Sequence, residues 1–291
     1  MGTEEDRAAL LAALRLQIEW GADEALADSP LDRTAVSAVA TLPPPGASFP
    51  AAARAPATAG PGSPLARPAI RSGGALLLPA AAPPAASRAA ELADAAGDLD
   101  ALRESMARFE GSPLRETATN LVFADGAAGS GLMLIGEAPG ADEDRLGLPF
   151  VGVSGRLLDR MLLSIGLRRE RDFYVTNILP FRPPGNRTPT DAEIALFLPF
   201  VLRHVELASP RVLVLLGGTA SKALLRSREG ITRLRGRWHE VAPREGGAPW
   251  PALATLHPAY LLRNPAAKKD AWHDLLLLRR RLDAYVAGAS P

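Results

Sequence analysis

The sequence predicts an α/β fold in which a parallel, four-stranded sheet is covered by helices. One observation is a set of four short apolar runs, each ending at a glycine, an asparagine or a histidine. The other is that segments with helical spacing of their apolar residues lie between and after these runs, each with an aspartate, serine or threonine at or near its start. Strands that alternate with helices are typical of parallel sheets. The expected strands are residues 132–135, 173–177, 212–216 and 252–256, and the expected helices are residues 155–165, 191–207, 219–225 and 270–285.

Composition divides the chain into three parts: a first helix, a linker and the domain that contains the predicted sheet. Residues 1–27 have the apolar spacing of an amphipathic helix. Residues 28–87 are dominated by Ala and Pro, a composition that cannot bury enough apolar surface to offset its ordering entropy, so we expect a disordered linker. A second helical stretch, near 87–109, leads into the folded domain expected over residues 88–291. The tethered first helix suits docking to a protein partner, or packing onto the domain itself.

The overall composition excludes several classes of protein. A net charge of +1 and a pI near 8.2 give no global basic field, so any surface for nucleic acid must be local. No run approaches the length of a membrane span, and the acidic start lacks a secretory pattern, so we expect a cytoplasmic protein. The chain contains no cysteine, which excludes disulfides, thiolate nucleophiles and cysteine-ligated zinc or iron-sulfur centres.

The first strand end is the most informative, because a glycine-rich acidic loop follows it. Gly136 and Gly140 permit close approach of a ligand to the backbone. Phe150 then offers a flat face, and a helix is expected to begin near Ser154. Open α/β sheets bind ligands outside the carboxyl ends of their strands. The alternative is an ordinary tight connection from strand to helix.

The other strand ends add polar groups to the same edge of the sheet. Asn177 could read the edge of a base with its amide or could equally cap a turn. Thr219 and Ser221 begin a helix whose amino end could hold a phosphate, although simple capping explains them as well. His257 stands at the last strand end, before a loop braced by proline.

Three groups of motifs follow one another along the chain. They are Gly-Glu-Ala-Pro-Gly-Ala-Asp-Glu-Asp at 136–144 with Gly-Leu-Pro-Phe-Val-Gly at 147–152, Thr-Asn at 176–177 with Arg-Pro-Pro-Gly-Asn-Arg-Thr-Pro at 182–189, and His-Pro-Ala-Tyr-Leu-Leu-Arg at 257–263. Taken together, these motifs resemble the family 4 uracil-DNA glycosylases, and the resemblance covers roughly residues 105–285. It implies a three-layer α/β/α fold and hydrolysis of the N-glycosidic bond of deoxyuridine in DNA, which leaves an abasic site.

The chain departs from this family at the four cysteines that typically hold an iron-sulfur cluster. The corresponding positions are Phe109, Ser112, Phe181 and Phe197, none of which can be a thiolate ligand. We therefore expect no cluster, no other cofactor and no metal. The three phenylalanines are expected to form a small aromatic core, where burial of each can contribute about 2 to 3 kcal/mol.

The resemblance also implies roles for individual residues. Phe150 would stack on a flipped uracil, and Asn177 would hydrogen-bond its pairing edge and exclude cytosine. Glu143 would reject the methyl group of thymine. His257 would stabilise charge that develops on a uracil oxygen.

Water activation is less well defined by the sequence. The resemblance implies that the polar loop holds the attacking water, with the backbone near Ala138 and the Asn177 side chain as candidates. Glu137 or Asp142 could act as the base, whereas Glu137 and Asp144 could instead organise the loop.

We expect the protein to bind DNA through a local set of contacts to phosphates. The residues at helix starts and loops of this edge are Ser154, Arg182, Arg187, Thr219, Ser221, Lys222 and Arg263. Tyr260, Leu261 and Leu262 would insert into the gap left by the flipped nucleotide, as apolar wedges do. The alternative is that Leu261 and Leu262 belong to the core.

The leading hypothesis is thus a monomeric uracil-DNA glycosylase that acts on single- or double-stranded DNA. One alternative is a catalytically weak protein that binds uracil or abasic sites in DNA. Another is an α/β enzyme that acts on a free nucleotide or another small molecule, although the sequence shows no Walker motif and no complete dinucleotide fingerprint.

Overall fold

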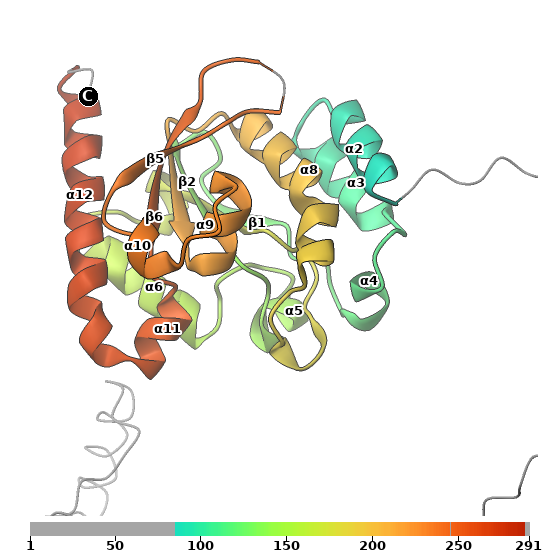
Figure 1. Ribbon diagram of the computed structural model, residues 1–291, viewed down its shortest axis with the longest axis horizontal. Helices are drawn as coiled ribbons and strands as arrows, with labels where there is room; N and C mark the ends of the chain where they lie inside the picture. Colours follow the sequence, from blue (N-terminus) through green and yellow to red (C-terminus); the bar gives the residue numbers. More distant parts are fainter. Residues whose placement is uncertain (1–84, 245, 289–291) are drawn as a thin grey trace, which may run out of the picture. The chain divides into compact units, whose positions relative to one another are not determined.

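A computed structural model describes residues 85–244 and 246–288 (Figure 1). The predicted helix at 1–27 and all but the last three residues of the predicted linker lie outside the described residues. Within the described part, no helix is long and apolar enough to cross a membrane.

The sheet has six strands in the order β1-β3-β2-β4-β6-β5, rather than the four that we expected. The four predicted strands form its parallel centre, and β1 and β5 are added antiparallel at the two edges. The edge strands escaped prediction because they are short, partly exposed and lack an apolar run. The strands are β1 (Ala124–Gly126), β2 (Leu132–Gly136), β3 (Tyr174–Asn177), β4 (Val212–Leu216), β5 (Trp238–Val241) and β6 (Trp250–Thr255).

Helices flank this sheet, and the four that we expected between and after the strands are present to within a few residues at their ends (Figure 1). The α-helices are α2 (Ala85–Ala95), α3 (Leu99–Arg108), α4 (Leu114–Thr117), α5 (Ala141–Leu146), α6 (Val153–Leu163), α7 (Arg169–Asp172), α8 (Asp191–Ala208), α9 (Gly218–Leu225), α10 (Ile231–Leu234), α11 (Pro258–Arg263) and α12 (Lys268–Val286). The described residues also form two 3-10 helices, η1 (Pro184–Asn186) and η2 (Pro265–Ala267).

The helical stretch expected near 87–109 is two helices, α2 and α3, rather than one. The break falls at Gly97, a weak helix former, and at Asp98, whose carboxylate accepts a hydrogen bond from the Ala101 N–H at 2.8 Å. That bond caps the amino end of α3. The start of α2 also places residues 85–87, assigned above to the linker, within a helix.

Strands β2 and β4, in the middle of the sheet, carry no polar side chain because both of their faces are buried. Met133 and Ile135 share a core cluster with α2, α3, α8 and α9. Leu132 and Leu134 point the other way, into a cluster with α6 and α12. This alternation is the period of two expected of a strand, and it fixes the sheet between the two groups of helices.

The predicted aromatic core is present and is larger than expected. Phe197 lies 5.9 Å from Phe109, 6.0 Å from Phe181 and 6.3 Å from Phe200 between ring centroids, and Phe109 also contacts Phe200 at 5.4 Å. Several of these pairs meet edge to face, the geometry that aromatic quadrupoles favour. Ser112, the fourth of the corresponding positions, is also buried. Without a single cysteine in the chain, these positions do not fit an iron-sulfur cluster.

Candidate active site

The carboxyl ends of the parallel strands meet where the sequence placed the site. Gly136 at the end of β2 pairs with Asn177 at the end of β3, and the Gly217 N–H after β4 donates to Thr255 of β6 at 2.8 Å. A cavity of about 460 Å³ opens there, within the size range of ligand pockets. Its lining includes the predicted residues Glu137, Ala138, Gly140, Glu143, Phe150, Ser154, Asn177, Arg187, His257, Tyr260 and Arg263, together with Pro139, Pro183, Asn186, Thr188 and Ala259.

Phe150 forms one wall of the cavity in an unusual backbone conformation. Its φ is +54°, in the left-handed region, and its side chain is only 5% exposed. The ring lies so close to Gly136 that a Cβ there would come within 2.4 Å of Phe150 Cζ. A non-glycine residue in a sparsely populated region costs about 1 to 3 kcal/mol, so the surroundings must hold it. Gly136 is thus required for close packing of the ring rather than for a turn.

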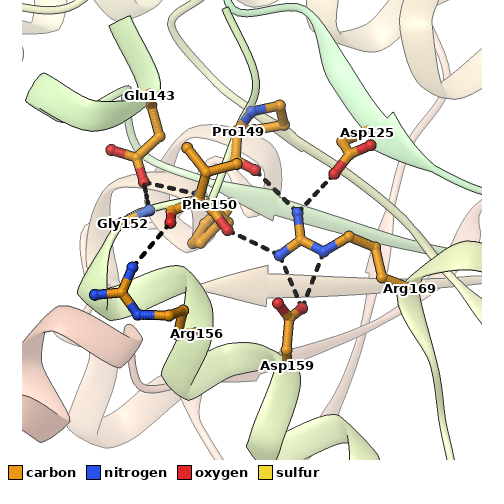
Figure 2. Close-up of polar contacts among 9 residues, drawn as sticks. Asp125, Glu143, Pro149, Phe150, Gly152, Arg156, Asp159 and Arg169 are labelled. Carbon is orange, nitrogen blue, oxygen red and sulfur yellow. Dashed lines mark hydrogen bonds and ion pairs between the residues drawn. The ribbon is translucent and has the colours of Figure 1, made fainter. Parts of the chain in front are cut away.

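Two carboxylates from the acidic loop brace this wall. Glu143 Oε1 accepts hydrogen bonds from the N–H groups of Val151 and Gly152, at 3.0 and 2.8 Å (Figure 2). Its Oε2 accepts one from the Gly140 N–H at 3.2 Å. Asp144 is buried and accepts hydrogen bonds from the backbone at 119 and 120. Glu143 therefore organises the loop, a role that we had expected of Glu137 and Asp144. The exclusion of thymine by Glu143 stays a prediction.

Asn177 presents an unpaired acceptor at the cavity. Its side chain is buried, and Oδ1 has no hydrogen-bond partner among the described residues. The same oxygen would lie 2.5 Å from a Cβ at Gly136, beside the Phe150 ring. A buried acceptor left unsatisfied costs about 1 to 3 kcal/mol, which a ligand donor would recover. Among the described residues this oxygen therefore caps no turn, and the reading of a base by Asn177 stays a prediction.

His257 caps the start of α11 and is held in one tautomer. Its Nδ1 accepts a hydrogen bond from the Ala259 N–H at 3.1 Å, which leaves the ring proton on Nε2. Burial, and then the positive charge of Arg263, lower the pKa of His257 to about 4. The ring therefore stays neutral at physiological pH. Its centroid lies 5.6 Å from that of Phe150.

Of the two candidate bases, Glu137 and Asp142, it is Glu137 that lines the cavity. Glu137 Oε2 accepts a hydrogen bond from the Thr219 hydroxyl at 2.5 Å, a contact between the β2 loop and the start of α9 that the sequence did not suggest. Asp142 lies on the exposed side of α5 and pairs with Arg145.

The residues expected to grip DNA divide into those near the cavity and those elsewhere. Ser154, Arg187 and Arg263 line it, and Arg187 makes a bidentate pair with Glu193 at 2.6 and 2.9 Å. That pair lowers the pKa of Glu193 to about 2. The Arg182 Nε donates to Asn186 at 2.7 Å, and Lys222 is exposed on α9. The Thr219 hydroxyl is committed to Glu137 and is not free for a phosphate.

Two of the expected DNA contacts are wrong because the side chains are buried. Ser221 is fully buried, and its hydroxyl donates to the carbonyl of Gly217 at 2.7 Å. Leu261 is also fully buried, in a small cluster with Leu157 and its neighbours, so it cannot act as a wedge. Leu262 is partly buried against the same cluster. Tyr260, which is 40% exposed at the cavity mouth, remains the candidate for insertion.

Comparison with known proteins agrees with this geometry. Residues 123–276 match the sequence model of the uracil DNA glycosylase superfamily. The chain is 36% identical over 184 residues to a type-4 uracil-DNA glycosylase of Pyrobaculum aerophilum, an alignment that covers 62% of this chain and 92% of that protein. It is 39% identical over 175 residues to the type-4 enzyme of Archaeoglobus fulgidus, with 59% and 86% covered. This chain therefore belongs to the uracil-DNA glycosylase superfamily.

Proposed function

We propose that this protein hydrolyses the N-glycosidic bond of uracil in DNA after the base has left the stack, and leaves an abasic site. The observation that carries the proposal is the unpaired Oδ1 of Asn177, buried beside Phe150 at a cavity large enough for one base. Base-modifying enzymes read a flipped base by hydrogen bonds to its pairing edge and by stacking on aromatic side chains.

The amide of Asn177 suits uracil rather than cytosine. Uracil offers an N3–H donor to Oδ1 and its O4 as an acceptor for the Nδ2–H group. Cytosine offers a lone pair at N3, which would face Oδ1 without a proton between them. Phe150 would stack on the base from the side of Gly136, and the Glu143 brace at the cavity wall would leave little room for a 5-methyl group.

His257 would receive the charge that develops on the leaving base. When the bond from C1′ to N1 breaks, its electron pair stays on uracil and is shared with the O2 oxygen. The Nε2–H group is a fixed, neutral donor, since Nδ1 is already bonded to the Ala259 N–H. A neutral imidazole with a pKa lowered at a helix start can act in this way as an electrophile.

Glu137 and the backbone of Ala138 would act on the side of the sugar. A carboxylate favours the oxocarbenium character that develops at C1′. As water adds to C1′, Glu137 would take up the proton that the water loses. The hydroxyl of Thr219 donates to Oε2 and so would leave Oε1 for the water.

The remaining parts of the proposal concern the wider surface and chain. Arg182, Arg187, Arg263, Lys222 and Ser154 would hold phosphates, and Tyr260 would fill the gap left by the base. The helices on the two sides of the sheet support a three-layer α/β/α architecture. We also propose that the domain works as a monomer on single- or double-stranded DNA, and that the segment at 1–27 binds a protein partner.

A gel assay tests this function. The protein is incubated with a labelled single-stranded oligonucleotide that contains one uracil and is then treated with alkali, with cytosine and thymine oligonucleotides in parallel. We expect cleavage at uracil alone. Asn177→Ala should lower the excision rate by about 100-fold, since base-reading contacts of this kind are worth about 1 to 3 kcal/mol each. The control Gly97→Ala, at a position where nothing lies within 4 Å of an added Cβ, should leave the rate unchanged.

Two other results would point away from catalysis. A shifted band without cleavage would support the DNA-binding alternative. If the oligonucleotide is not cleaved and its band does not shift, the proposal is contradicted.

A further inference from the structure

Arg169, at the start of α7, lies behind the Phe150 wall and outside the cavity lining. Its guanidinium donates to the carbonyl oxygens of Pro149 and Phe150, at 3.0 and 2.9 Å (Figure 2). It is only 12% exposed. No feature of the sequence singled it out, because it stands within a run of charged residues.

All five N–H donors of this guanidinium have an acceptor. Besides the two carbonyls, Nη1 donates to Asp125 of β1 at 2.9 Å. Nε and Nη2 both donate to Asp159 of α6, at 2.9 and 2.8 Å. Arginine has five donors in a rigid plane, so its position and its orientation are both determined here.

The hydrogen bonds from Arg169 hold the residue of the loop whose backbone conformation is least favourable, Phe150. The two carbonyls that accept from Arg169 flank the left-handed backbone of Phe150. Just beyond, the next two N–H groups donate to Glu143. Gly155 packs against the same carbonyl, and a Cβ there would lie 1.8 Å from the oxygen of Phe150. The backbone of Phe150 is therefore fixed through its carbonyl by Arg169 and through the following amides by Glu143.

We propose that Arg169 is a positioning residue for the reaction, which sets the plane of the Phe150 ring against the flipped base without touching that base. This inference rests on the proposed function, in which Phe150 is the stacking surface. Asp125 and Asp159 hold the arginine in turn, so the ring is tied to three separate elements of the fold.

Lysine cannot replace this arrangement. An ammonium group donates three hydrogen bonds from one nitrogen, and it cannot reach two successive carbonyls and two carboxylates at once. Arg169→Lys keeps the positive charge between the two aspartates and removes the planar fork. The variant therefore separates the loss of geometry from the loss of charge.

The test measures single-turnover excision of uracil by Arg169→Lys, first in the wild-type protein and then in a Phe150→Ala background. With Phe150 present, we expect a loss of about 10- to 100-fold, the scale of misplacing a reacting group by about 1 Å. In the Phe150→Ala background, the same substitution should cost less than about 2-fold, because residues that act through one another are not additive.

A matched control is Arg203→Lys, which removes an arginine that also bonds to a backbone carbonyl, that of Ala96, and to a carboxylate, that of Glu206. It lies outside the cavity lining and should leave the rate unchanged. If Arg169→Lys does not fold, Asp125→Asn takes its place, because it loosens the arginine from the partly exposed side. The loss should be smaller, and it should again vanish in the Phe150→Ala background.

A second readout is chemical rescue. Guanidinium ion at millimolar concentration should restore part of the activity of Arg169→Ala, and urea or sodium chloride should not. Equal losses from Arg169→Lys in both backgrounds, or no loss with Phe150 present, would overturn the inference while the proposed function stands. An inactive wild-type protein would instead overturn the proposed function and this inference with it.

Discussion

Gly136→Ala is the substitution whose effect follows most directly from the geometry of the cavity. The new methyl group would lie 2.4 Å from Phe150 Cζ and 2.5 Å from Asn177 Oδ1. Ordinary contacts between such atoms are near 3.5 Å, so the ring must retreat by about 1 Å. Its backbone is fixed by Arg169 and Glu143, so the retreat would tilt the ring out of its position. A displacement of this size costs about 100-fold in rate, and the overpacking costs about 1 to 3 kcal/mol of stability.

The assay is single-turnover excision of uracil at saturating enzyme, together with urea unfolding of each variant. Gly97→Ala provides the control, because nothing lies within 4 Å of a Cβ at that position between α2 and α3. We expect the control to excise uracil at the wild-type rate. A folded Gly136→Ala variant within about 3-fold of the wild-type rate would refute the reasoning, because the ring would then tolerate a shift that the structure does not allow.

Three further predictions concern protonation, the aromatic core and the cavity mouth. Because the pKa of His257 is lowered to about 4, the excision rate should stay level from about pH 8 to pH 5.5 and fall only as the ring takes up a proton at lower pH; an inflection near pH 6.5 that disappears in His257→Gln would contradict this. Phe197→Ala should cost about 3 to 5 kcal/mol in urea unfolding, since the ring is fully buried, and metal analysis of the wild-type protein should find no stoichiometric iron. Tyr260→Ala should slow excision from duplex DNA with little change in stability, whereas Leu261→Ala should cost about 2 to 5 kcal/mol of stability; the reverse pattern would restore Leu261 as the wedge.

The sequence predicts the centre of this fold well because the central strands are buried on both faces. The continuous apolar runs of β2 and β4 leave little ambiguity about where these strands lie. The edge strands β1 and β5 carry no such signal, because most of their residues are partly or fully exposed and include polar side chains. The short helices α4, α5, α7, α10 and α11 are set by caps and tertiary contacts, which are not visible as a periodic pattern.

The site divides in the same way into residues that a sequence pattern indicates and residues that only tertiary contacts bring together. Strand ends indicated that Gly136 and Asn177 would lie at one edge of the sheet, and the parallel register pairs these two residues. That Phe150 would meet Asn177 followed only from the family resemblance. The sequence could not distinguish Leu261 from Tyr260, because a single turn of helix presents one to the core and the other to solvent. Arg169 was also out of reach, because its partners Asp125 and Asp159 are separated from it by 44 and 10 residues.

Two chain segments adjacent to the aromatic core are hydrogen-bonded to the loop that lines the cavity, so the packing of the core bears on the site. Phe181 closely follows Ile178 and Leu179, whose N–H groups donate to the carbonyls of Gly136 and Glu137 at 2.9 and 3.0 Å. Beyond Phe109, the backbone at 119 and 120 donates to Asp144 of the acidic loop. The rings thus anchor two segments that each hold that loop. Burial is a weaker and less directional tie than metal coordination, so a loss of packing at Phe197 should reach the excision rate through the loop before the whole domain unfolds.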